Sequence, residues 1–217
     1  METDLAQKIK NIIFDYGNVI FEIDFLRTQN AFSKLGISNV EEFFAHKGHN
    51  QIFNDLETAA ISPAQFRDAI RTATGNQQLT DGQINDAWNS LLIGVPSKHV
   101  HDTLLRAKER YRTFLLSNTN EIHYNWITDH LKNKYEMTGN ESLFERVYYS
   151  QQMFLRKPDI AIFDRVLQEN GLKPEETLFI DDSPQHLEGA RKAGLRTLLM
   201  DRHPSQLHTF LSDHGLL

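Results

Sequence analysis

The feature that most constrains the fold of this chain is a repeated alternation of short apolar runs with longer helical patterns. Beyond residue 96 the apolar runs predict strands at 113–117, 146–149, 177–180 and 196–200. The patterns between and beside them predict helices at 97–110, 122–132, 160–170, 184–193 and 204–214. Alternation of this kind is typical of an open parallel sheet that helices cover on both faces.

The stretch between the first strand and the rest of the alternation has a different pattern. The first strand is predicted at Ile9–Asp15, whereas residues 24–92 show helical spacing, two capping boxes, four predicted helices and no convincing strand. We therefore predict an α/β protein with a doubly wound, mostly parallel, Rossmann-like sheet and an inserted helical-bundle cap. Residues 1–22 and 93–217 would form the core, and residues 23–92 would form the cap.

Composition excludes several classes of function. The chain has 217 residues and no cysteine, which excludes disulfides, thiolate zinc sites and cysteine nucleophiles. A net charge of −6 argues against nucleic acid as a partner, and no apolar run is long enough to cross a membrane. The acidic N-terminus lacks the pattern of a secretory signal, so we expect a cytoplasmic protein. The oligomeric state stays open.

Three predicted strands end abruptly at small polar or acidic residues. The first ends at Asp15, the next core strand ends at Ser117, and a later one is followed by Asp181 and Asp182. One such junction is an ordinary strand exit, but three meet at the edge of an open sheet where ligands bind. Crowded carboxylates raise one another's pKa unless a cation lies among them, which favours a divalent ion such as Mg²⁺. Lys157, next to a proline, is the candidate for a balancing positive charge.

These residues, in this order, resemble the four motifs of the haloacid dehalogenase superfamily of hydrolases, most of which are phosphatases. The run Asp15-Tyr16-Gly17-Asn18-Val19 matches the first motif, Ser117 the second, Lys157 the third and the pair Asp181-Asp182 the fourth. The segment 24–92 is similar to the helical cap that these enzymes insert after the first motif. The resemblance covers nearly the whole chain and implies hydrolysis of a phosphate ester through an aspartyl-phosphate.

The resemblance also implies a role for each matched residue. Asp15 would be the nucleophile, and Ser117 and Lys157 would be the other catalytic residues. The Mg²⁺ ligands would be Asp15, the Gly17 carbonyl oxygen, Asp182 and Asp181. The groups that bind substrate and phosphate would be Tyr16, Gly17, Ser117, the Asn118 backbone N–H and Lys157.

Gly17 departs from the family pattern. Most phosphatases of the family have an aspartate at this position as general acid, and losing a general acid costs about 10²–10⁴-fold with a poor leaving group. In an anomeric sugar phosphate the sugar is a good leaving group and needs a general acid less. The sequence around Asp15 also resembles a subgroup that includes bacterial α-glucose-1-phosphate phosphatase and has glycine at this position. We therefore predict a Mg²⁺-dependent phosphatase of small phosphorylated metabolites, with sugar phosphates as the first choice.

Two alternatives stay open. A 2-haloacid dehalogenase also lacks the second aspartate, but such enzymes resemble this chain less: they bind no metal, and typically have an aromatic residue where Gly17 stands. In such an enzyme the pair Asp181-Asp182 would serve no obvious purpose. The other alternative is a catalytically weak scaffold that binds a phosphorylated metabolite or a protein. Gly17 keeps this alternative open, whereas the intact Asp15 and Lys157 disfavour it, since a charge cluster without a function is costly.

Overall fold

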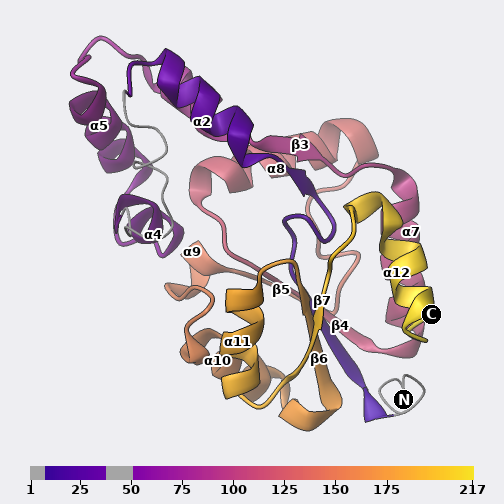
Figure 1. Ribbon diagram of the computed structural model, residues 1–217. Helices are drawn as coiled ribbons and strands as arrows, with labels where there is room; N and C mark the ends of the chain where they lie inside the picture. The colour runs from indigo at the N-terminus through magenta and orange to yellow at the C-terminus, as the bar shows by residue number, and fades with distance from the viewer. Residues whose placement is uncertain (1–7, 38–50) are drawn as a thin grey trace.

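The computed structural model describes residues 8–37 and 51–217. Five strands form one sheet in the order β5-β4-β1-β6-β7, and each neighbouring pair is parallel (Figure 1). Their bounds are Asn11–Phe14 for β1, Arg112–Ser117 for β4, Arg146–Tyr149 for β5, Thr177–Asp181 for β6 and Arg196–Leu199 for β7. The predicted α/β fold with a mostly parallel sheet is therefore confirmed.

Successive residues of the central strand point to opposite faces of the sheet, as the pleat requires. Ile13 of β1 belongs to an apolar cluster with residues of α10 and α11, such as Phe163 and Leu187. Its neighbours Ile12 and Phe14 belong to a second cluster, which includes residues of α7 and α12. Helices therefore cover both faces (Figure 1). The bounds are Lys98–Arg110 for α7, Ile160–Asn170 for α10, Pro184–Lys192 for α11 and Leu207–Asp213 for α12.

Most predicted elements of the core form with small shifts at their ends. The predicted strand 9–15 is shorter, and α8 (Glu121–Tyr135) continues into a stretch that was predicted to be a loop. The residues 204–206 form a 3₁₀ turn before α12. The short helix α9 (Ser150–Met153) was not predicted, because a single turn is too short to show helical periodicity.

The inserted segment is helical in the residues that the structure describes. Its helices there are α2 (Phe25–Lys34), α4 (Gln51–Glu57), α5 (Pro63–Thr74) and α6 (Asp81–Asn89). Figure 1 shows α2, α4 and α5 gathered away from the sheet. Both capping boxes form: Ser62 with Gln65 begins α5, and Thr80 with Gln83 begins α6.

The chain crosses between the sheet and this segment twice, and the two crossings pair with each other. β2 (Glu22–Ile23) and β3 (Leu92–Gly94) form a short antiparallel ladder. No strand was predicted in residues 24–92, and the described residues from 24 to 91 contain none, but β3 begins at Leu92, one residue inside the predicted range. In the described ranges, no helix has the length and apolar character needed to span a membrane.

Aromatic packing joins the inserted segment to the core. The Trp88 ring of α6 stacks on His123 of α8, with ring centroids 4.5 Å apart, and on Phe53 of α4, at 4.9 Å. The imidazole of His123 lies against Asn120 Nδ2 and the Trp88 carbonyl oxygen. Burial lowers the pKa of His123 to about 4, so this contact is made by a neutral ring at physiological pH.

Candidate active site

Three aspartates meet at the carboxyl ends of the two central strands. Asp15 follows β1 directly and Asp181 ends β6, and the parallel register sets Phe14 beside Ile180. The Asp15 N–H donates to the Ile180 carbonyl oxygen at 2.9 Å, which continues the ladder. Carboxylate oxygens of Asp15, Asp181 and Asp182 lie within 4.8 Å of one another. The structure thus brings together the three acidic residues that the sequence predicted at one edge.

A single buried lysine joins two of these carboxylates. Lys157 has no solvent exposure, and its Nζ donates to Asp15 Oδ1 at 2.5 Å and to Asp181 Oδ2 at 2.8 Å. The ammonium also lies 5.3 Å from the centre of the Phe179 ring. Lys157 therefore points inward, as the predicted balancing charge should.

The two carboxylates that share Lys157 have opposite pKa shifts. Burial, followed by repulsion from Asp181, raises the pKa of Asp15 to about 8, although Lys157 acts against both. Burial also acts on Asp181, but attraction from Lys157 and His186 outweighs it and lowers the pKa to about 2. Burial and the neighbouring Asp181 raise the pKa of Asp182. One ammonium is therefore too little positive charge for three carboxylates in so small a volume.

This donor set fits a hard divalent cation. Mg²⁺ prefers oxygen ligands, and carboxylates lower their own repulsion when a cation lies among them. Asp15 and Asp181 are buried and Asp182 is half-buried, so water screens their mutual repulsion only in part. Burial is the larger cause of the raised pKa of Asp15, and repulsion from Asp181 adds to it.

Two polar side chains that sequence reasoning did not assign hold the aspartates in place. Asn18 donates from Nδ2 to Asp182 Oδ2 at 3.2 Å and accepts the Ile23 N–H at 3.2 Å. His186 Nδ1 lies 3.0 and 3.1 Å from the two carboxylate oxygens of Asp181. Asn18 belongs to the quoted first motif, and His186 lies in the first turn of the helix after β6. Their positions next to strand ends are the signal that could have found them.

The remaining predicted residues lie near this cluster in different ways. Ser117 is the last residue of β4 and is buried. The Asn118 side chain bonds to the backbone of Lys157, so its backbone N–H stays the predicted phosphate contact. The Tyr16 side chain packs in the core, stacked on Phe21 with centroids 5.2 Å apart, which leaves its backbone for any contact with phosphate.

An apolar side chain of the inserted segment lies close to Gly17. A Cβ added to Gly17 would lie 3.0 Å from Ile23 Cδ1, closer than side-chain carbons normally pack. Ile23 belongs to β2, at the crossing into the inserted segment. The space into which a side chain at residue 17 would project is thus filled by an apolar group.

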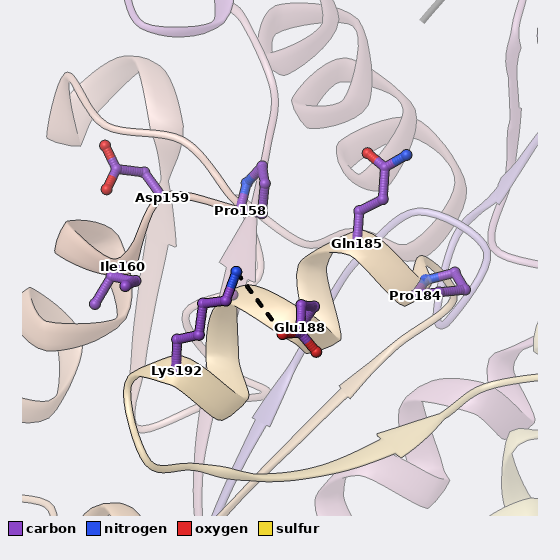
Figure 2. A pocket seen from close by; sticks show the side chains of 8 residues that line it. Pro158, Asp159, Ile160, Pro184, Gln185, Glu188 and Lys192 are labelled. Carbon is purple, nitrogen blue, oxygen red and sulfur yellow. Dashed lines mark ion pairs between the residues drawn. The ribbon is translucent and has the colours of Figure 1, made fainter. Parts of the chain in front are cut away.

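Two cavities flank the loop that carries Lys157. One of about 520 Å³ separates the chain around Leu56–Pro63 from α8 and α9, and polar side chains such as Glu121 and Gln151 line it. The other, of about 650 Å³, lies where α10 and α11 begin, with Pro158 at its rim (Figure 2). The three aspartates line neither of them.

An ion pair crosses from the inserted segment to this same loop. Arg156 Nε donates to Glu57 Oε2 at 2.8 Å, and both side chains are only partly exposed. Glu57 is the last residue of α4, and Arg156 is the neighbour of Lys157. The inserted segment therefore contacts the chain directly beside the buried lysine.

Comparison with known proteins identifies the family of the chain. A family model described as haloacid dehalogenase-like hydrolase matches residues 33–200. A D-ribitol-5-phosphate phosphatase from Bacteroides thetaiotaomicron is 30% identical over 191 residues, which are 87% of this chain and 90% of that protein.

Solved structures agree as well. A haloacid dehalogenase family enzyme from Bacteroides thetaiotaomicron, in complex with magnesium and inorganic phosphate, is 39% identical with a TM-score of 0.79, covering 92% of this chain and 98% of that one. A predicted hydrolase of the same family from Porphyromonas gingivalis is 34% identical with a TM-score of 0.79, covering 88% and 91%. An L-2-haloacid dehalogenase from Xanthobacter autotrophicus, 17% identical with a TM-score of 0.51, covers 87% and 76% and shares the fold alone. The chain therefore belongs to the haloacid dehalogenase-like hydrolases.

Proposed function

We propose that this hydrolase is a Mg²⁺-dependent phosphatase of small phosphorylated metabolites, with Asp15 as its nucleophile. The observation that carries the proposal is the cluster of Asp15, Asp181 and Asp182 around one buried ammonium group. A related phosphatase of known substrate and a related enzyme that binds magnesium and inorganic phosphate support it.

Asp15, Asp181, Asp182 and the Gly17 carbonyl oxygen would hold the metal ion. When bound, Mg²⁺ supplies positive charge that offsets the repulsion between an anionic phosphate and these carboxylates. Binding the ion would also lower the pKa of Asp15 and leave its carboxylate ionised, as a nucleophile must be. Lys157 and Ser117, with the Asn118 N–H, would bind the phosphate oxygens.

The reaction needs two displacements at phosphorus. An Asp15 oxygen forms a bond to phosphorus while the ester P–O bond breaks, and the departing alkoxide takes a proton from water. A second water molecule then attacks the phosphorus of the aspartyl-phosphate, which releases inorganic phosphate and restores Asp15. Since no bond is formed to the lysine, Lys157 would act through charge and position alone.

The substrate we propose first is a sugar phosphate, and the surroundings of Gly17 bear on which kind. Glycine at residue 17 has no side chain that can donate a proton to the leaving group, and Ile23 Cδ1 lies 3.0 Å from where a Cβ would stand. An anomeric phosphate needs such a donor least. The related phosphatase, by contrast, acts on D-ribitol 5-phosphate, an ester of a primary alcohol. Both types of ester therefore belong in the first substrate panel.

The proposed core and cap would enclose such a substrate between them. We propose the core at residues 1–22 and 93–217 and the cap at residues 23–92, supported by the β2–β3 ladder at the two crossings. The cavity of about 520 Å³ between the inserted segment and α8 is not lined by Asp15, so it is proposed only as space next to the site that could take the part of a sugar or polyol distant from the phosphate.

The experiment that tests this function is phosphate release from D-ribitol 5-phosphate, glucose 1-phosphate and glucose 6-phosphate, with Mg²⁺ and with EDTA. We expect turnover only with Mg²⁺, and a loss on the order of 10⁴-fold or more in kcat for Asp15→Asn. Asp129→Asn, an exposed aspartate of α8, is the matched control and should keep wild-type activity.

Each outcome has a defined meaning. A preference for glucose 1-phosphate would support the anomeric substrate, and equal rates on all esters would mean that another group donates the proton. Turnover that survives in EDTA or in Asp15→Asn would contradict the mechanism. Halide release from 2-chloropropionate without phosphate release would replace the proposal with a dehalogenase.

A further inference from the structure

We infer that Asn118 is a positioning residue, whose side chain fixes the backbone of Lys157 so that the lysine ammonium reaches both carboxylates. Its effect on catalysis rests on the function proposed above, but the contact itself does not. Asn118 Nδ2 donates to the Lys157 carbonyl oxygen at 2.9 Å, and the Lys157 N–H donates to Asn118 Oδ1 at 2.9 Å. One side-chain amide thus pairs with both backbone groups of one residue.

The two bonds from Asn118 take the place of the backbone hydrogen bonds that a neighbouring strand would make to Lys157. The residue lies in the loop between α9 and α10, outside every strand of the sheet. Asn118, in contrast, directly follows β4, which is held by β1 and β5 on either side. The side-chain amide of Asn118 therefore links the end of β4, which is held on both sides, to Lys157 in a loop 39 residues further along the chain.

The residue type matters because both bonds are needed from one planar group. A backbone peptide group offers one hydrogen-bond donor and one acceptor. An asparagine amide offers an acceptor oxygen and two N–H donors, so it can bond to both groups. Aspartate can only accept, and serine has a single small hydroxyl that cannot span both atoms. Asn118 is thus suited to hold the Lys157 backbone, in addition to any phosphate contact through its own N–H.

The opposite side of the same loop is fixed by close packing. A Cβ added to Gly189 of α11 would overlap the Pro158 carbonyl oxygen and lie 3.0 Å from its carbonyl carbon. Figure 2 shows Pro158 over α11, beside Gln185 and Glu188 of that helix. The loop is therefore confined between Asn118 and α11, which leaves the Lys157 backbone little freedom to move.

This confinement decides where the ammonium lies. A lysine side chain has several rotatable bonds, and ordering it costs conformational entropy. With its Cα fixed, the side chain of Lys157 reaches Asp15 and Asp181 at 2.5 and 2.8 Å. A shift of the backbone would lengthen both contacts together, and misplacing a catalytic group by about 1 Å can cost 10²-fold in rate.

The direct test is the amide hydrogen exchange of Lys157, measured by NMR on the full chain. In Asn118→Ala the Lys157 N–H loses its acceptor, and we expect its exchange to become roughly tenfold faster. Asn118→Asp keeps an acceptor oxygen but loses the donor, so its exchange rate should lie between wild type and Asn118→Ala. Asn133→Ala, an exposed asparagine of α8, is the control and should leave the rate unchanged.

Kinetics with Mg²⁺ and an active ester tests whether Asn118 acts through Lys157. We expect Asn118→Ala to lower kcat by up to about 10²-fold, and Asn118→Asp by less. In a Lys157→Met background, Asn118→Ala should lower kcat no further, because the group it positions is gone.

The outcomes separate this inference from the proposed function. An unchanged Lys157 exchange rate in Asn118→Ala overturns the inference, whatever the activity. Losses in kcat that multiply in the double variant also overturn it, because Asn118 would then act on the substrate itself. If wild type releases phosphate from no ester, the proposed function fails, while the exchange rates still decide whether Asn118 holds Lys157.

Discussion

Charged side chains are arranged differently at the two ends of the central sheet. At the amino ends of the strands, carboxylates are paired with cations at the surface: Glu176 with Lys10 at 3.0 Å and Lys173 at 3.7 Å, and Glu145 with Arg112 at 2.6 Å. At the carboxyl ends, three carboxylates lie close together, and the completely buried ammonium of Lys157 pairs with two of them, Asp15 and Asp181. The same strands thus end in a balanced, solvated surface on one side and an unbalanced, buried cluster on the other.

The difference shows which end of the sheet is the candidate for chemistry. Exposed ion pairs contribute little, typically below about 1 kcal/mol, and they neither help nor harm a function elsewhere. Burying carboxylates costs stability, and the raised pKa of Asp15, caused by burial first and by Asp181 second, is consistent with such a cost. A protein keeps such a cluster where a ligand of opposite charge completes it, which is why the carboxyl end is the candidate site.

The sharpest way to break this comparison is to remove the shared ammonium. Lys157→Met removes the ammonium that the buried Asp15 and Asp181 share, and we expect it to lower the free energy of unfolding by about 3–5 kcal/mol in EDTA. Urea unfolding followed by circular dichroism measures the loss. A loss below 1 kcal/mol would mean that Asp15 and Asp181 are neutralised in some other way.

The next effect is the pH dependence of the metal-free protein. The pKa of Asp15 is raised in the folded state to about 8, so folding favours its protonated form. Stability from this group is full below about pH 4 and is lost as pH rises towards 8. The shift of Asp181 acts only below pH 4 and does not offset this loss.

Because the lowered pKa of His123 makes stability rise with pH up to about 6.5, we expect the urea midpoint in EDTA to fall between about pH 6.5 and pH 8, and Asp15→Asn to lessen that fall. Added Mg²⁺ at about 100 times its Kd should restore about 2.7 kcal/mol at the upper pH. A flat profile for wild type in EDTA would show that Asp15 is not the group with the raised pKa.

A smaller effect should follow from adding one more carboxylate to the crowded end. Gly17→Asp places a side chain against Ile23 and a fourth charge near Asp15, and we expect a loss of about 1–3 kcal/mol. Combining it with Ile23→Ala removes the steric part, so the double variant should be the more active of the two on poor leaving groups. Equal activities on glucose 6-phosphate would rule out this explanation of Gly17.

The smallest effect is expected at the amino end. Lys10→Met breaks an ion pair in which Lys10 is 68% exposed, so the free energy of unfolding should change by less than about 1 kcal/mol. Phosphate release should stay at the wild-type level. A loss as large as that of Lys157→Met would remove the distinction between the two ends.

Much of the core was predictable, because its signals are local. The helices of the core have periodic apolar faces, and α10 begins and ends where the sequence placed it, closed by Gly171 in the left-handed conformation. Asp15, Asp181 and Asp182 could be placed together because parallel strands end at one edge of a sheet. Short or irregular pieces such as α9 gave no periodic signal and were missed.

What the sequence determined by itself was therefore the order of elements and the side of the sheet where acidic residues gather, since both follow from patterns along the chain. The tertiary structure alone decided that Lys157 turns inward, that Asn118 holds its backbone, that His186 supports Asp181 and that Ile23 fills the space beside Gly17. These contacts join residues whose spacing along the chain carries no periodic signal, so only the packing of loops against strand ends brings them together.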